Sequence, residues 1–111
     1  MIAVTEAVLD EMVAAIVQEI DPEQIYLFGS RARGDARPDS DVDLLIVEQG
    51  PPDPRCSRWE KLVQLSRCLA RFRIPNDTLI YSRNEVERWR HTTNHVVARA
   101  LREGKLLYER S

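Results

Sequence analysis

The segment QIYLFGSRARGDARPDSDVDLLIV (Gln24–Val47) contains two apolar runs that enclose a polar, highly charged stretch. The first run, QIYLF, stops at a glycine, and the second, DLLIV, is equally short, as is typical of buried strands. We therefore predict two strands and a connecting loop. That loop begins with Gly29 and Ser30, and the second strand begins with two carboxylates, Asp41 and Asp43.

Helical and strand patterns alternate along the rest of the chain, and no internal repeat interrupts them. Apolar residues at helical spacing precede Pro22, and a second apolar stripe follows the second strand. NDTLIYS predicts a third strand, and the capping-box pattern SRNE (82–85) opens a third helix that we expect to continue to Leu101. KLLYE, after Gly104, predicts a short terminal strand. We expect one domain, residues 1–111, of the α/β (α+β) class, with a small mixed sheet of three to four strands covered by helices.

Composition narrows the classes of protein to which the chain can belong. Its 111 residues carry a formal charge of -2 and are enough for one modest hydrophobic core. Residues 1–53 hold 12 acidic and 3 basic residues, whereas residues 54–111 hold 6 acidic and 13 basic ones. Two explanations stay open: solvated helix faces, or an acidic cluster for cations beside basic side chains for phosphates or an acidic partner.

The cysteines and the hydropathy pattern indicate in which cellular compartment the protein is expected. No apolar run approaches the roughly 18 residues of a membrane helix, so we expect no membrane association. Cys56 and Cys68 form no C-x-x-C pair, and no secretory segment precedes them. We therefore expect a reduced, cytoplasmic protein with neither a disulfide nor a zinc cluster.

Asp41 and Asp43 are candidate ligands for a cation. Side chains alternate along a strand, so residues two apart project from the same face with their carboxylates within reach of each other. Such proximity raises a pKa and destabilises the fold unless a divalent cation offsets the repulsion. Oxygen ligands of this kind suit Mg2+ or Mn2+. A bare Asp-x-Asp is more often only a polar strand entrance that binds nothing.

Gly29 and Ser30 supply a second feature of the same loop. Glycine lets the backbone approach a ligand closely, and serine suits the start of a following helical turn, whose free N–H groups bind anions. A phosphate-binding turn on one strand and a cation pair on the next are the parts of a site for a nucleoside triphosphate and its metal.

GS, ten intervening residues and DVD together resemble the signature of the DNA polymerase beta-like nucleotidyltransferase superfamily. The small size and the wording GSRARG resemble its minimal nucleotidyltransferase (MNT) branch, and the resemblance covers essentially the whole chain. It implies that Gly29 and Ser30 contact the triphosphate and that Asp41 and Asp43 bind Mg2+. The superfamily's third carboxylate lies on a later strand, for which the candidate is Asp77 in NDTLIYS, as a metal ligand or base.

The resemblance also implies a reaction and a partner. With two Mg2+ ions (or Mn2+), a hydroxyl attacks the α-phosphate of the triphosphate and pyrophosphate leaves. In HEPN/MNT toxin–antitoxin pairs, the MNT antitoxin transfers AMP, with ATP as the expected donor, to a tyrosine of an all-helical HEPN toxin. Direct nucleic-acid binding is not expected, and a homodimer or a complex with the partner is compatible with so small a domain. The alternative is a non-catalytic antitoxin that masks its partner by stoichiometric binding.

Other side chains carry weaker predictions. Arg31 and Arg33 either neutralise phosphate charge or are solvated loop residues. The two histidines are four positions apart on the predicted third helix, but they lack the glutamate of H-E-x-x-H and are not predicted to bind zinc. Trp59 and Trp89 fall on apolar stripes and are predicted to lie in the core.

Overall fold

The computed structural model describes residues 4–49 and 57–110, in which helices and strands alternate much as the sequence predicts. The elements in chain order are α1 (Glu6–Ile20), β1 (Gln24–Phe28), α2 (Ser30–Arg33), β2 (Val42–Glu48), α3 (Arg58–Leu69), the 3-10 helix η1 (Ala70–Phe72), β3 (Asn76–Ser82), α4 (Arg83–Trp89), α5 (Val96–Glu103) and β4 (Lys105–Glu109).

The strands form one mixed sheet in the order β3-β2-β1-β4. β1 is antiparallel to both β2 and β4, while β2 and β3 are parallel. A parallel pair needs a crossover connection, which α3 provides. The predicted α+β class and the small mixed sheet covered by helices are confirmed.

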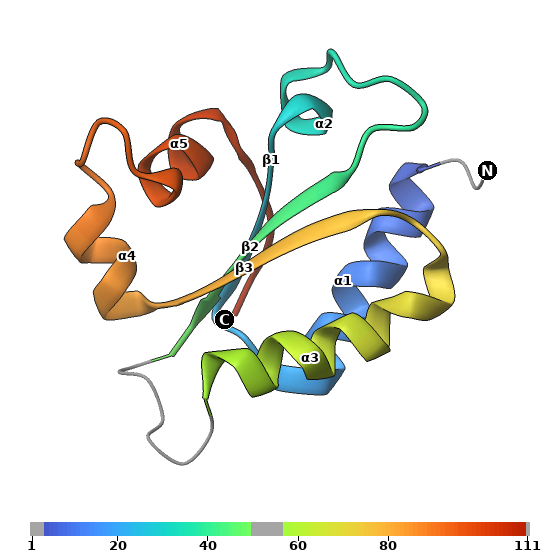
Figure 1. Cartoon of the computed structure of the whole chain (residues 1–111), viewed down its shortest axis with the longest axis horizontal. Coiled ribbons are helices and arrows are strands. Elements are labelled where there is room, and N and C mark those ends of the chain that lie inside the picture. The colour runs from blue at the N-terminus through green and yellow to red at the C-terminus, as the bar shows by residue number, and fades with distance from the viewer. Residues whose placement is uncertain (1–3, 50–56, 111) are drawn as a thin grey trace.

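Helices cover both faces of the sheet, with α1 and α3 on one side and α4 and α5 on the other (Figure 1). The side chains of β2 alternate between the two faces of the sheet. Leu44 and Ile46 belong to the core under α1 and α3, whereas Leu45 and Val47 belong to the core under α4 and α5. By the same alternation Asp43 lies on the α4 and α5 side.

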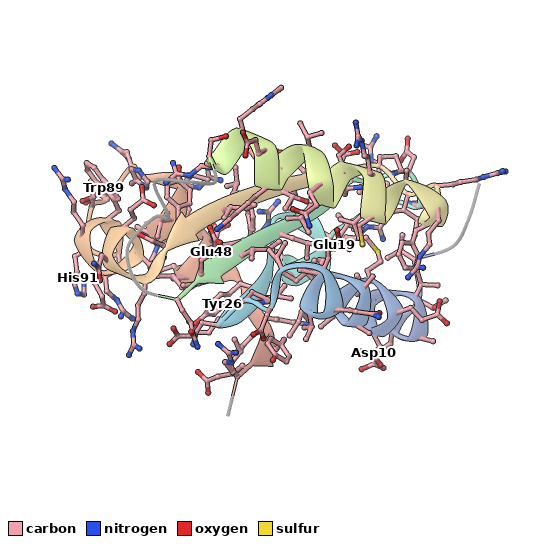
Figure 2. The ribbon with its side chains drawn as sticks, turned by 90° about the horizontal axis from the view of Figure 1, so that it is seen from below. Asp10, Glu19, Tyr26, Glu48, Trp89 and His91 are labelled. Carbon is pink, nitrogen blue, oxygen red and sulfur yellow. The ribbon has the colours of Figure 1, made fainter. Side chains whose placement is uncertain are left out.

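The acidic residues of α1 are exposed, as expected on a solvated helix face. Figure 2 shows Asp10 on the outer side of α1, and Trp89 and His91 at the end of the molecule where α4 lies.

Within the described residues no helix is both long enough and apolar enough to cross a membrane. Cys68 is a free thiol whose Sγ lies 3.6 Å from the carbonyl oxygen of Ala15. The prediction for Cys56 falls outside the described residues.

The predicted continuous third helix was wrong, because the chain breaks between α4 and α5. His95 is the N-cap of α5, and its Nδ1 accepts a hydrogen bond of 3.1 Å from the Val97 N–H. The His95 ring stacks on Trp89, with their centroids 4.5 Å apart. Apolar spacing runs across this break and conceals it. His91 and His95 therefore do not share a helix face.

The predicted core position of Trp59 was also wrong. Trp59 lies near the start of α3 and is 73% exposed, whereas Trp89 is half-buried against His95. The apolar stripe of α3 is real, with Leu65 and Leu69 buried beneath it, but Trp59 lies outside the buried part of the helix.

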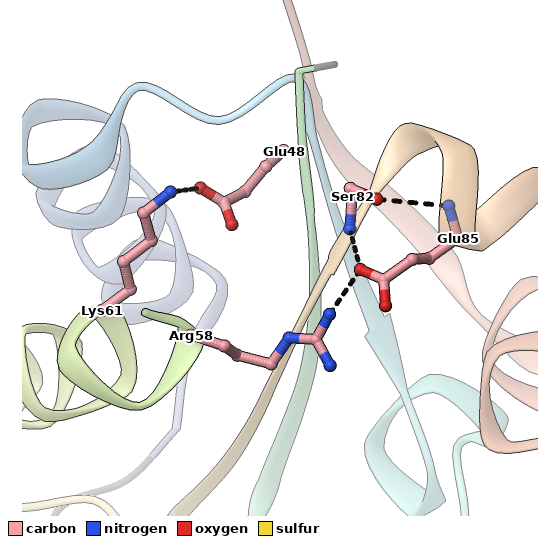
Figure 3. Close-up of polar contacts among 5 residues, drawn as sticks. All are labelled: Glu48, Arg58, Lys61, Ser82 and Glu85. Atoms are coloured by element: carbon pink, nitrogen blue, oxygen red, sulfur yellow. Dashed lines mark hydrogen bonds and ion pairs between the residues drawn. The ribbon is translucent and has the colours of Figure 1, made fainter. Parts of the chain in front are cut away.

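Ion pairs and a helix cap join α3, β2 and α4 (Figure 3). Lys61 of α3 pairs with Glu48 at the end of β2, and Arg58 pairs with Glu85 of α4. Glu85 also accepts a 2.9 Å hydrogen bond from the Ser82 N–H, and its own N–H donates to the Ser82 hydroxyl at 3.2 Å. The predicted capping box is therefore confirmed.

Candidate active site

Gly29 forms the turn between β1 and α2, and only glycine fits it well. Its φ of 74° and ψ of -158° lie in a region that residues with a side chain rarely adopt. A Cβ atom at this position would lie 2.1 Å from Oδ2 of Asp43. Gly29 therefore provides both the sharp turn and the space that the Asp43 carboxylate occupies.

Ser30 begins α2, a helix of four residues, as the sequence predicts for a helical turn after Gly29. The Gly29 carbonyl accepts hydrogen bonds of 3.1 Å from the N–H groups of Ala32 and Arg33. Ala32 is buried in the core and Gly34 ends the helix in a left-handed conformation. This short helix fixes Ser30 directly after the end of β1.

The pairing of β2 with β3 brings the second and third candidate carboxylates together. Asp43 and Asp77 are partners in the parallel register, and Phe28 of β1 lies opposite Asp43 on the other side. Neighbouring strands lie about 4.8 Å apart, so the two carboxylates start from adjacent positions. Asp43 is half-buried, while Asp77 and Asp41, the residue before β2, are exposed.

The carboxylate of Asp43 lies in an electrostatically unfavourable position. Burial raises the pKa of Asp43 above the ordinary aspartate value, the charges of Asp77 and Asp41 raise it further, and Arg33 lowers it in part. The charges of Asp41 and Asp77 therefore both act on the carboxylate of Asp43. A divalent cation would oppose each of the effects that raise this pKa.

The three carboxylates do not by themselves make a closed metal cage. Among the residues that the structure describes, no three His, Cys, Asp or Glu side chains are grouped closely enough to hold a metal ion. Mg2+ in phosphoryl-transfer sites is held by only one or two carboxylates together with oxygens of the substrate phosphates. The donor set of Asp41 and Asp43 fits an ion that arrives with a phosphate.

A cleft of about 330 Å3 opens beside Asp43. α2 forms one of its walls and α5 forms another, while the ends of β1 and β2 contribute the rest of the surface. The lining residues are Phe28, Gly29, Ser30, Arg33, Asp43, Val96, Arg99 and Glu103. The structure thus gathers Gly29, Ser30 and Asp43 at one cleft, and places Asp41 and Asp77 outside its lining.

The two arginines that the sequence leaves open have different positions. The Arg31 guanidinium donates to the Ser40 carbonyl from Nε at 3.1 Å and from Nη2 at 2.7 Å, and to the Pro38 carbonyl at 3.2 Å. Arg31 therefore holds the loop that leads into β2. Arg33 lines the cleft, where its Nη1 lies 3.4 Å from Oε2 of Glu103.

The contribution of α5 to the cleft, namely Arg99 and Glu103, was not predicted from the sequence. These two residues are one helical turn apart and lie on the same side of α5. Their position depends on close packing at Gly104, where a Cβ atom would lie 2.2 Å from the Ala100 carbonyl oxygen and 2.8 Å from that of Leu27. Gly104 was visible in the sequence as a helix end, but no local pattern indicates which strand α5 approaches.

Most of the chain matches a known protein family. The family described as "Polymerase beta, Nucleotidyltransferase" matches residues 11–111 of the chain. No curated protein matches the sequence significantly.

Solved structures share the fold over most of the chain. A protein of Sulfolobus solfataricus that is assigned as a nucleotidyltransferase is 25% identical, with a TM-score of 0.64, and the match covers 92% of this chain and 78% of that one. A toxin–antitoxin complex with AMP-PNP is 20% identical, with a TM-score of 0.57 and coverage of 92% and 74%. The complex of a tri-AMPylated Shewanella oneidensis HEPN toxin with its MNT antitoxin is 17% identical, with a TM-score of 0.53 and coverage of 96% and 74%. At these identities the two complexes establish likeness of fold.

Proposed function

Because this chain belongs to the polymerase beta nucleotidyltransferase family, we propose that it is a Mg2+-dependent nucleotidyltransferase that transfers AMP from ATP to a hydroxyl of another protein. The solved relatives include a toxin–antitoxin complex with AMP-PNP and an AMPylated HEPN toxin bound to its MNT antitoxin. The acceptor that we propose is accordingly a tyrosine of a HEPN-type helical toxin, for which this chain is the antitoxin. We propose that the pair acts in the cytoplasm.

The position of Asp43 is the observation that carries the proposal. Its carboxylate lies against Gly29 at the cleft, and on the opposite side of β2 it is paired in register with Asp77 of β3. A nucleotide in the cleft and an acceptor that approaches past Asp77 would meet at this carboxylate. A carboxylate beside both reactants, with a metal ion that it would hold, can position the acceptor oxygen close to the α-phosphorus.

Asp41 and Asp43 are the residues that would hold Mg2+ together with oxygens of the phosphates, and Asp77 is the candidate for a third ligand or for the base. The raised pKa of Asp43, which is caused by burial and by the neighbouring carboxylates, is an imbalance that a cation relieves. Bound Mg2+ would supply neutralisation of the triphosphate charge and a lowered pKa of the attacking hydroxyl.

The remaining roles belong to the chain's own groups. Gly29 and Ser30 border the phosphates, and Arg33 is the cation of α2 on the cleft side. The acceptor oxygen attacks the α-phosphorus, and the bond from that phosphorus to the bridging oxygen of pyrophosphate breaks. Asp77 is exposed beside Asp43 and is the group placed to accept the proton of the hydroxyl.

The direct test is the intact mass of the HEPN-type protein encoded beside this chain, after incubation with the chain and Mg-ATP. We expect one or more increments the size of an adenylyl group on a tyrosine. The double variant Asp41→Asn/Asp43→Asn should give no increment. The same incubation with excess chelator should also leave the mass unchanged.

The opposite result would identify the alternative function. If the partner binds this chain tightly and its mass never changes, transfer is not the activity, and the chain neutralises its partner by covering it. Binding that persists unchanged in the double variant, together with full neutralisation, would support the same conclusion.

A further inference from the structure

The cleft contains an arginine that lies outside the GS and DVD motif. We propose that Arg99 of α5 binds the phosphates of the nucleotide. This inference rests on the proposed function, and it assigns a substrate-binding residue to a helix that the motif does not include. Arg99 lines the same cleft as Gly29 and Ser30, but from a different element.

The charges of the cleft favour Arg99 over Arg33 as the available cation. Two carboxylates, Asp43 and Glu103, and two guanidinium groups, Arg33 and Arg99, line the cleft, so their formal charges cancel. Arg33 is already engaged, with Nη1 3.4 Å from Glu103. No ion pair joins Arg99 to any other residue in the described part of the chain. A polyanion that enters the cleft therefore meets one guanidinium that has no carboxylate partner among residues 4–49 and 57–110.

The packing of α5 against the sheet fixes the position of the Arg99 backbone beside the cleft. Val97 and Ala100 are fully buried on the sheet side of the helix, which sets the rotation of α5 about its axis. Gly104 then brings the end of the helix against β1. The backbone at Arg99 is consequently held in place before any ligand binds. An arginine so placed presents a planar set of donors that matches phosphate oxygens.

Arg102 provides a matched control. It lies on the same helix three positions later and is exposed like Arg99, yet it does not line the cleft. Arg99→Ala and Arg102→Ala therefore remove the same charge and the same side chain from the same helix. Any difference between the two variants in nucleotide affinity comes from position.

The experiment is a calorimetric titration of the full chain with Mg-ATP for the wild type, Arg99→Ala and Arg102→Ala. We expect Arg99→Ala to weaken binding about ten- to a hundredfold, the effect of losing a hydrogen bond to a charged group. Arg102→Ala should stay within about twofold, because an exposed charge outside the site contributes little. Equal melting temperatures of the two variants without ligand show that both fold.

Adenosine, used as a competitor of ATP, distinguishes a contact to the phosphates from a contact to the nucleoside. Arg99→Ala should leave the affinity for adenosine unchanged, and an equal loss for adenosine and ATP would overturn the assignment to phosphate. Equal affinities of Arg99→Ala and Arg102→Ala for Mg-ATP, with the wild type still binding, would overturn the role of Arg99 and leave the proposed function standing. A wild type that binds no Mg-ATP would overturn both.

Discussion

Asp43 occupies a position that an isolated carboxylate would avoid. It is half-buried, and both burial and the charges of Asp77 and Asp41 raise its pKa. An acid whose pKa is raised by folding stabilises the fold at low pH, and this contribution is lost as the pH rises through the raised value. The charged Asp43 therefore lowers the free energy of unfolding at neutral pH, as is common for residues that a functional site requires.

Replacing Asp43 with asparagine should stabilise the metal-free protein at neutral pH, because asparagine keeps the shape of the side chain and removes its charge. The gain in the free energy of unfolding should be absent well below the ordinary aspartate pKa of 3.8 and should grow as the pH rises through the raised value. Urea unfolding in the presence of chelator, measured across this pH range, checks the prediction.

Asp39→Asn, in the exposed part of the preceding loop, serves as the control for that series. It should leave the pH dependence as it is in the wild type. A stabilisation by Asp43→Asn that is the same at every pH would mean that packing, and not charge, governs this position.

Gly29 and Gly34 lie at the two ends of α2, and replacing each with alanine distinguishes the effect of backbone strain from that of steric crowding. Both have positive φ, 74° and 86°, but an added Cβ meets Asp43 at Gly29 and nothing within 4 Å at Gly34. Gly34→Ala should reduce the free energy of unfolding by about 1 kcal/mol from strain alone. Gly29→Ala should reduce it more, on the order of 2–4 kcal/mol, because the steric conflict is added.

Denaturant unfolding of a double-mutant cycle tests this difference. In an Asp43→Ala background, Gly29→Ala should approach the smaller effect of Gly34→Ala, since the carboxylate that it meets is gone. Equal effects of Gly29→Ala in both backgrounds would show that the backbone conformation alone requires this glycine.

At the scale of an element, α4 depends on its first turn. Burial tends to raise the pKa of Glu85, but the hydrogen bond from the Ser82 backbone N–H and the guanidinium of Arg58 outweigh it, and the pKa is lowered. The stabilisation that Glu85 provides is therefore present above its ordinary value of 4.5 and is lost as the pH falls through the lowered value.

Ser82→Ala should reduce the free energy of unfolding by about 1 kcal/mol, the usual effect of losing an N-cap side chain. Glu85→Gln should destabilise the protein at neutral pH and remove part of the loss of stability on acidification. Glu87→Gln, two positions later on the exposed side of α4, is the control and should do neither. Thermal unfolding followed from pH 7 to acid checks both variants, and identical curves for Glu85→Gln and Glu87→Gln would contradict the role of the cap.

Elements were predictable from sequence where local chemistry defines them. The Ser82 capping box and the helix end before Pro22 are set by groups within a few residues, and the structure has both. The break between α4 and α5 was not predictable in this way. At the break His95 caps α5 and stacks on Trp89, two contacts that apolar spacing does not encode, and the periodicity of apolar residues is unchanged across it. Trp59 likewise falls on the apolar spacing of α3 and is nevertheless exposed, whereas Leu65 and Leu69 on the same helix are buried.

At the scale of the whole molecule, the site was predictable only as far as the motif extends. Gly29 directly follows β1, and Asp43 lies on β2, which is adjacent to β1 in both sequence and sheet, so their meeting followed from a short connection. The register that pairs Asp43 with Asp77 comes from a crossover, and the identity of the third carboxylate in the reaction stays a prediction. Arg99 could not be found at all, because its place depends on the packing of a distant helix.

The uneven charge of the two halves of the chain also acquires a structural explanation. Several ion pairs join an acidic residue of the first half to a basic residue of the second, or the reverse. Each is partly exposed and contributes little alone, on the order of 0–1 kcal/mol. These pairs are Arg33–Glu103, Lys61–Glu48, Arg83–Glu23 and Arg110–Asp21.

The strand order has a consequence for how the protein is made. β4, the last strand, pairs with β1, the first, and α5 completes the cleft that begins at Gly29. A growing chain that has left the ribosome as far as β2 already carries the whole nucleotide motif, but it has neither the second wall of the cleft nor the outer neighbour of β1. The cleft forms only when α5 emerges, so nascent chains that end before Glu103 are expected to emerge with the motif and without the capacity to bind nucleotide in the cleft.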